Sequence, residues 1–179
     1  MGARSYIMHQ EIEVVDRDGL KEFREKIRNG EIDYYLDDSG KPMKFLADSI
    51  VLKGEQRPGW DEPNIVEEDC VEWDDWKICS YWYDHFVFFI RDLAVFIDGE
   101  VEIECSEAEA QAKLYFSGGA CNMEIGSMEW ESRTPKTLQE ESMEQEKAWE
   151  KAHGIKPSRK CLPELPEWLK RKALLRGGS

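Results

Sequence analysis

Residues 100–125, EVEIECSEAEAQAKLYFSGGACNMEI, decide the fold of this chain. Three stretches within them alternate apolar and polar side chains, with the period of two that a half-buried β-strand shows. The segments SEAEA and SGG separate these stretches as turns. Glu100, Glu102 and Glu104 then share one solvated face, opposite the apolar side chains. The segment therefore predicts an antiparallel meander with one acidic face.

A long apolar helix is expected directly before the meander. Apolar side chains from Cys79 to Ile97 recur at steps of three and four, which indicates an amphipathic helix. We expect this helix over Asp75–Ile97, ended by Asp98 and Gly99 and packed on the apolar face of the sheet. Its apolar residues cover more than one side, as in a helix that is sandwiched or lies at an interface.

The N-terminal region predicts smaller elements. Asp16 or Asp18 caps a short helix that ends at Gly30, because Leu20, Phe23 and Ile27 follow a helical spacing. The expected strands are Tyr6–Val15, Ile32–Leu36 and Phe45–Leu52. In the first of these, Tyr6, Met8, Ile12 and Val14 are expected to share one face, with Gln10 as an exception.

The C-terminal region predicts two helices. A capping box at Thr137–Glu140 begins a polar helix that runs to His153. Pro166 then precedes a short cationic helix that ends at Leu175. The predicted fold is α+β: an antiparallel or mixed β-sheet packed on one long amphipathic helix, with a helical C-terminal extension.

The charge divides the chain at the same point. Residues 1–132 carry 31 acidic and 13 basic side chains, a net charge of −18, whereas residues 133–179 carry 7 and 11, a net charge of +4. We therefore expect an acidic α+β domain over 1–132 and a basic extension over 133–179. Such an asymmetry bears on partners and solubility, because net charge governs association. An acidic body repels DNA, RNA and acidic surfaces.

No motif of catalysis or cofactor binding occurs in the sequence. There is no GxSxG, P-loop, GxGxxG or CxxC, so we expect no enzyme, no cofactor and no metal site. No stretch is long and apolar enough to span a membrane, and no signal peptide is recognisable. The five cysteines are an odd set, which favours reduced thiols in a cytoplasmic protein.

Two acidic segments are candidate binding sites. Asp61–Asp75 contains eight acids and no base, and Glu100, Glu102 and Glu104 repeat every ~6.6–7 Å along one strand. That repeat is comparable to the phosphate spacing along a nucleic-acid strand, so these carboxylates fit cationic sites meant for phosphate. The alternative is that both segments are merely solvated, or that Lys113 and the basic extension neutralise them.

Residues Trp73–Glu131, with IDGEVEIECSEAEAQAKLYFSGGACNMEIGSMEW at their centre, resemble small bacterial and prophage proteins in which a helix leads into an acidic β-meander. The resemblance covers about a third of the chain and contains no catalytic residue. Here the turn SEAEA replaces the usual Gly-containing one, and the extension has no counterpart. The resemblance implies a phage or mobile-element setting, in which small acidic proteins inhibit host defence nucleases or partner toxins.

We therefore expect a non-catalytic inhibitor of the anti-restriction or anti-CRISPR kind, a nucleic-acid mimic that occupies the basic surface of a nuclease or another nucleic-acid-handling complex. A surplus aromatic residue such as Trp60 or Trp73 is expected to anchor the contact. The candidate partner-binding residues are Trp60, Asp61, Glu62, Glu67, Glu68, Asp69, Glu72, Trp73, Glu100, Glu102 and Glu104. Two alternatives stay open. One is a homo-oligomeric scaffold in which the basic extension of one copy binds the acidic body of the next, and the other is an immunity protein for a cognate toxin.

Overall fold

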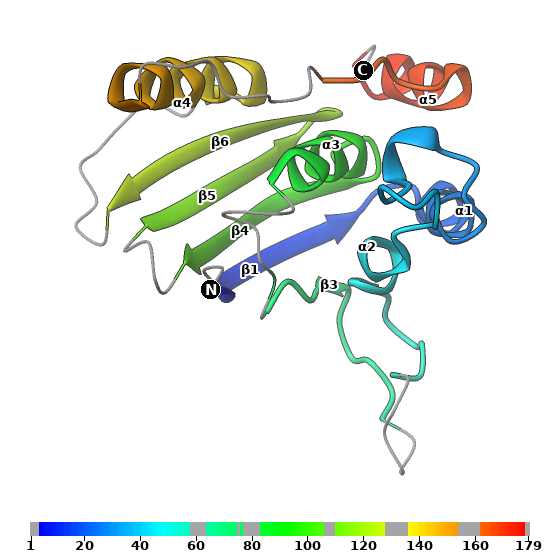
Figure 1. Ribbon diagram of the computed structural model, residues 1–179. Coiled ribbons are helices and arrows are strands. Elements are labelled where there is room, and N and C mark those ends of the chain that lie inside the picture. Colours follow the sequence, from blue (N-terminus) through cyan, green and yellow to red (C-terminus); the bar gives the residue numbers. More distant parts are fainter. Residues whose placement is uncertain are drawn as a thin grey trace.

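The main sheet has five antiparallel strands in the order β1-β4-β5-β6-β7, and β2 and β3 pair separately. Figure 1 shows β1, β4, β5 and β6 side by side. The computed structural model describes residues 4–57, 64–74, 76, 83–105, 110–127, 136–153 and 162–177. The strands are β1 (Ser5–Val14), β2 (Ile50–Val51), β3 (Cys70–Val71), β4 (Ile97–Cys105), β5 (Ala110–Ser117), β6 (Ala120–Ser127) and β7 (Lys136–Thr137). The helices are α1 (Arg17–Arg28), α2 (Lys44–Asp48), α3 (Tyr83–Leu93), α4 (Leu138–His153) and α5 (Glu167–Gly177).

The helix α3 lies across one face of the sheet, which we call the inner face (Figure 1). The buried side chains of α3 share one apolar core with alternate residues of β4, β5 and β6. Val101, Leu114 and Met123 stand opposite one another across these strands and are at most 2% exposed. The predicted α+β fold, with its acidic meander packed on an apolar helix, is confirmed.

Local capping explains the ends of the other helices. The carboxylate of Asp16 accepts a hydrogen bond from the amide of Gly19 and so caps α1, while Gly30 (φ +70°) follows its C-terminus. At α4, the amide of Thr137 donates to Glu140, and the amide of Glu140 donates to the hydroxyl of Thr137. Both caps were predicted, because each rests on contacts within four residues.

The end of α3 differs from the prediction. The helix ends at Leu93 instead of Ile97, and Ile97 begins β4. Apolar periodicity cannot locate this boundary, because Val95 and Phe96 in the turn and Ile97 at the start of β4 are all at most 2% exposed. The start of the predicted helix, before Tyr83, lies largely outside the described residues.

Two predicted strands are also wrong. Residues 32–36 contain a 3₁₀ turn over Asp33–Tyr35, and residues 45–52 divide between α2 and β2. Both segments are short, and residues next to each other are buried in the second, where Leu46 and Ala47 are both fully buried, so the apolar pattern does not define a strand.

A bulge changes the direction of side chains in β1. The pairing with β4 shifts between Ile7 and His9, so Met8 is 57% exposed and does not share a face with Ile12. Gln10 points to the inner side of the strand edge. Its side-chain amide donates to the carbonyl of Val71 (3.1 Å), and its side-chain oxygen accepts from the amide of Val71 (2.9 Å). The residue that seemed an exception in the sequence thus joins β3 to β1.

The helix α5 packs on the body of the molecule. Leu169 is fully buried in the core, and the ring of Trp168 lies 6.5 Å from Phe96 and 6.3 Å from Phe23. Lys172 pairs with Asp16 at 2.9 Å. The region after residue 132 therefore shares the core of the preceding region instead of forming a core of its own.

A buried carboxylate joins three segments under the inner face. Asp92 is fully buried and accepts hydrogen bonds from the hydroxyls of Tyr34 (2.5 Å) and Tyr35 (2.7 Å). Arg91 donates to Asp92 through Nε (2.7 Å) and to the carbonyl of Pro163. Burial raises the pKa of Asp92, although Arg91 and the two hydroxyls favour its charged form. The cluster fixes α3 against the 3₁₀ turn and the segment before α5.

Candidate functional site: the acidic outer face and the cleft beside it

Carboxylates gather on the sheet face opposite α3, which we call the outer face. The side chains that alternate with the buried residues of β1 and β4 form two neighbouring rows. The row on β4 is acidic throughout, and the row on β1 is acidic in its second half. The β4 row consists of Asp98, Glu100, Glu102 and Glu104, and the β1 row of Tyr6, His9, Glu11 and Glu13. Strand pairing fixes their separation at about 4.5–5.5 Å between Cβ atoms of opposite residues.

Like charges stand directly opposite each other at two positions. Glu11 pairs in register with Glu100, and Glu13 with Asp98. Such pairs destabilise a sheet unless a cation lies near both members. Within the described part of the chain, Glu11 and Glu13 have no basic partner within ion-pair distance, and both are exposed. The arrangement therefore costs stability and leaves a concentrated negative charge at the surface.

The other carboxylates of the outer face are only partly compensated. Lys113 stands opposite Glu102 with 4.0 Å between Nζ and Oε2, and His9 Nε2 lies 3.4 Å from Glu100. Asp98 at the end of the row pairs with Arg176 of α5. The basic extension thus neutralises the end of the row, and Lys113 one position of it, which is part of what the sequence suggested as the alternative to a binding role.

The negative charge of this face affects the pKa of Tyr115. It stands opposite Glu100 on β4, and its pKa is raised by partial burial and then by the carboxylates of Glu124, Glu100 and Glu102. A hollow of about 510 Å³ lies beside it, lined by side chains that include Glu11, Glu13, Glu100 and Tyr115. A partner's cationic group fits this hollow by charge.

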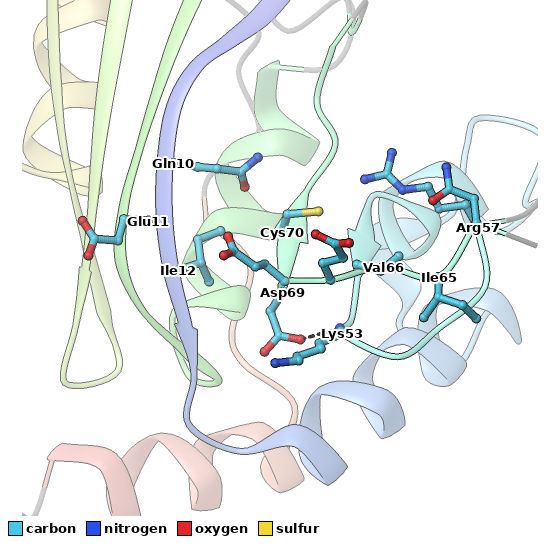
Figure 2. A pocket seen from close by; sticks show the side chains of 12 residues that line it. Gln10, Glu11, Ile12, Lys53, Arg57, Ile65, Val66, Asp69 and Cys70 are labelled. Atoms are coloured by element: carbon cyan, nitrogen blue, oxygen red, sulfur yellow. Dashed lines mark hydrogen bonds between the residues drawn. The ribbon is translucent and has the colours of Figure 1, made fainter.

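A second and larger hollow, which we call the cleft, lies on the other side of β1. It measures about 960 Å³ and separates β1 from the arm, our name for residues 52–57 and 64–69 (Figure 2). Gln10, Glu11 and Ile12 line it from β1. From the other side it is lined by Lys53, Arg57, Asn64, Ile65, Val66, Glu67, Glu68, Asp69 and Cys70. Since Glu11 borders both hollows, the acidic surface continues from the outer face into the cleft.

Buried and half-buried arginines hold the arm in place. Arg24 of α1 is 7% exposed and binds both carboxylate oxygens of Glu55, whose pKa this contact lowers. Arg57 pairs with Glu72 at 2.8 Å, and Arg17 with Asp69 at 3.0 Å. These three pairs involve six charged side chains around the cleft. Four other charged side chains that line the cleft have no ion pair in the described chain, namely Glu11, Glu67, Glu68 and Lys53.

The structure places the predicted site residues in three different settings. Glu67 and Glu68 are exposed in the cleft, and Glu100, Glu102 and Glu104 lie on the outer face, so two acidic segments distant in sequence border one surface. Asp69 and Glu72 are held in internal ion pairs. Trp60, Asp61 and Glu62 lie outside the described residues.

Trp73 is a correction. It was expected as an exposed anchor, but it is fully buried, and its ring contacts Phe86 at 5.3 Å and Trp76 at 6.1 Å. Its indole N–H donates to the hydroxyl of Ser49 (3.3 Å). A tryptophan whose N–H is satisfied inside the core has no atom left for a partner.

The sequence reasoning missed the contribution of β1. Glu11 and Glu13 were assigned to a strand but not to the acidic surface, because nothing in the sequence pairs β1 with β4. The signal available was the alternation of charged and apolar residues in EIEV, which matches that of EVEIE in β4.

The cysteines and possible metal ligands add no further site. Cys105 takes part in a disulfide, which corrects the expectation of reduced thiols, while Cys70 and Cys121 are free. Among the residues that the structure describes, no three His, Cys, Asp or Glu side chains gather as a metal site requires. No helix in the same part of the chain is long and apolar enough to cross a membrane.

Comparison with known proteins gives no assignment. No protein-family model, curated protein or solved structure matches this chain. Any function must therefore be argued from the acidic surface itself.

Proposed function

We propose that this protein is a non-catalytic binding protein that uses its acidic outer face to occupy a cationic, nucleic-acid-binding surface of another protein, and so inhibits it. The observation that carries the proposal is the direct opposition of Glu11 to Glu100 and of Glu13 to Asp98, of which Arg176 pairs only with Asp98. Folding gains nothing from these pairs, since opposite like charges lower stability. A basic partner surface supplies the missing counter-charge.

The spacing of the carboxylates supports a partner that normally binds a phosphate backbone. Along β4, Glu100, Glu102 and Glu104 repeat every ~6.6–7 Å, as alternate residues of a strand do. On β1, Glu11 and Glu13 stand opposite Glu100 and Asp98 and widen the acidic surface at this end of the row, whereas His9 and Tyr6 stand opposite Glu102 and Glu104. The regular spacing along β4 is the part that resembles a phosphate backbone. Direct binding of DNA or RNA to this face is disfavoured by repulsion.

The alternative of a scaffold held together by the basic extension has less support. Lys172 and Arg176 of α5 bind Asp16 and Asp98 of the same chain. These cations are already used, so they are not available to a second copy. Nothing distinguishes an immunity protein from an inhibitor of host defence except the identity of the partner. The phage or mobile-element setting remains part of this proposal, and so does the cytoplasmic location, against which the disulfide at Cys105 counts.

The test is capture of the partner with a charge-reversed outer face. A tagged chain carrying Glu11→Lys and Glu100→Lys is compared with the unaltered chain in pull-downs from host lysate, followed by mass spectrometry. Both side chains are exposed, and the variant exchanges one opposed pair of like charges for another, so the fold should persist. We expect the unaltered chain to retain a nucleic-acid-handling protein that moderate salt releases, and the variant to lose it.

A matched control separates position from net charge. Asp33→Lys with Asp38→Lys changes the net charge by the same amount at exposed positions of residues 31–41, which pack on the α3 side of the sheet. The control should capture the partner almost as well as the unaltered chain does. Equal capture by all three chains, or recovery of the bait alone, contradicts the proposal.

A further inference from the structure

The strand β1 forms one edge of the sheet, and only part of that edge is covered. Residues 71–74 and Trp76 lie antiparallel beside it: Ser5 N donates to the carbonyl of Trp76, and Ile7 N donates to the carboxylate of Asp74 at 2.8 Å. After the bulge, the side chain of Gln10 forms hydrogen bonds with both the N–H and the C=O of Val71. The segment thus replaces a neighbouring strand from Ser5 to Gln10.

Beyond Gln10 this cover leaves the edge. Asp69, two residues before Val71, turns away and accepts from Arg17 (3.0 Å) and from the amide of Lys53 (2.7 Å). The chain therefore diverges from β1, and the cleft opens between them at Glu11 and Ile12 (Figure 2).

The backbone of Ile12 points into this opening. Val15 N donates to Phe96 O, so in an antiparallel ladder the odd-numbered residues of this half of β1 bond to β4. The position of the Glu11 carbonyl supports this pattern, because it points toward β4 and lies against Gly99. The N–H and C=O of Ile12 consequently face away from β4, and no group in the described residues binds either of them.

The walls of the cleft specify what fits. Glu11, Glu67 and Glu68 outnumber Lys53 among the lining charges that have no internal pair in the described chain. Apolar surface lies between these charges, since Ile65 is 55% exposed and Ile12 is half-buried. An unpaired strand edge next to apolar side chains is a template for an added strand.

We propose that the cleft binds an extended, basic peptide segment of the partner, which adds to the sheet by main-chain hydrogen bonds to Ile12. The segment continues the row that residues 71–74 and Trp76 begin, with apolar side chains against Ile65 and basic side chains toward Glu11 and Glu67. This inference goes beyond the proposed function, because it assigns a main-chain docking mode to the cleft. It rests on that function only for the sign of the partner's charge.

The probe is a defined peptide instead of the unidentified partner. An acetylated and amidated heptapeptide that alternates Val and Lys is titrated into the full-length, isotope-labelled chain and followed by NMR. We expect the NMR signal of the Ile12 amide to shift, and the hydrogen exchange of this amide to slow, as the peptide saturates the protein. A second peptide carries N-methyl groups on two consecutive central amides, which removes a donor from each of its edges. It should bind about tenfold more weakly, as the loss of one or two net hydrogen bonds predicts.

A pair of protein variants tests the same bond from the other side. Ile12→Pro removes the outward N–H without removing a bond to β4, and proline is tolerated at such edge positions. Ile12→Val shortens the side chain and keeps the N–H. We expect the Pro variant to bind the peptide about tenfold more weakly and the Val variant to bind it almost unchanged.

The outcomes separate this inference from the proposed function. Equal binding of the two peptides, or binding without slowed exchange at Ile12, overturns strand addition and shows that only charge attracts the peptide. The exchange measurement uses the unaltered chain, so it decides the question even if Ile12→Pro does not fold. Loss of partner capture by Glu11→Lys with Glu100→Lys, together with normal capture by a folded Ile12→Pro chain, retains the proposed function and refutes the docking mode.

Discussion

The two faces of the sheet treat carboxylates in opposite ways. Under the inner face, Asp92 is fully buried and receives hydrogen bonds from Tyr34, Tyr35 and Arg91. On the outer face, Glu11 and Glu100 oppose each other, and within the described residues His9 is the one basic side chain within ion-pair distance of either. The first arrangement holds segments together, and the second leaves charge for something outside the chain. A carboxylate that stabilises the fold is therefore explained by the fold itself. A carboxylate that destabilises the fold points to a partner outside the chain.

The largest expected effect comes from Gly99, where the backbones of β1 and β4 approach each other closely. Gly99 of β4 has φ +122°, and a Cβ there would lie 1.9 Å from the carbonyl oxygen of Glu11. Gly99→Ala therefore forces β1 away from β4. We expect a loss of about 5 kcal/mol or more in the free energy of unfolding, measured by chemical denaturation.

Gly40→Ala is the matched control for this substitution. Gly40 also has a positive φ (+75°), but no atom lies within 4 Å of its added Cβ. It should cost about 1 kcal/mol, the strain of a left-handed alanine alone. Similar losses for the two variants would mean that β1 and β4 do not approach as closely as described.

The inner face gives the next largest effect. Asp92→Ala leaves the hydroxyl of Tyr35 and the guanidinium of Arg91 without their buried acceptor. We expect a loss of about 3 kcal/mol in the free energy of unfolding. Since Arg91 also donates to Pro163, hydrogen exchange in α5 should accelerate as well. Asp38→Ala, at an exposed position, should change stability by at most about 0.5 kcal/mol.

The outer face gives the smallest effect, with the opposite sign. Glu11→Gln removes one member of the opposed pair, so we expect a gain of about 0.2–1 kcal/mol in the free energy of unfolding at low salt. The gain should shrink in 1 M salt, where the screening length falls to about 3 Å. A loss of stability in Glu11→Gln would show that this carboxylate has a structural partner, and would weaken the comparison between the faces.

The sequence predicted those parts of the fold that rest on local rules. The meander, the cap at Asp16 and the capping box at Thr137 all depend on neighbours within a few residues. The end of α3 escaped prediction, because an unbroken apolar run carries no boundary. The direction of Tyr6 and Met8 escaped because one bulge reverses the alternation.

The sequence predicted several acidic residues of the candidate site, but not how the structure brings them together. Glu67 and Glu100 were recognised from runs of acids in the sequence. Their connection through Glu11 depends on β1 pairing with β4 across nearly ninety residues, a contact that no local pattern encodes. Trp73 shows the reverse error, since its exposure was inferred from surplus and its burial depends on Phe86 and Ser49.

The packing of α5 has a consequence for the order in which the chain is made. Phe23 and Phe96 reach their final environment only when Trp168 covers them, and Trp168 is synthesised more than seventy residues after Phe96. A nascent chain on the ribosome therefore carries an uncovered aromatic patch until late in translation. During that interval the patch is a binding site for chaperones and a starting point for aggregation.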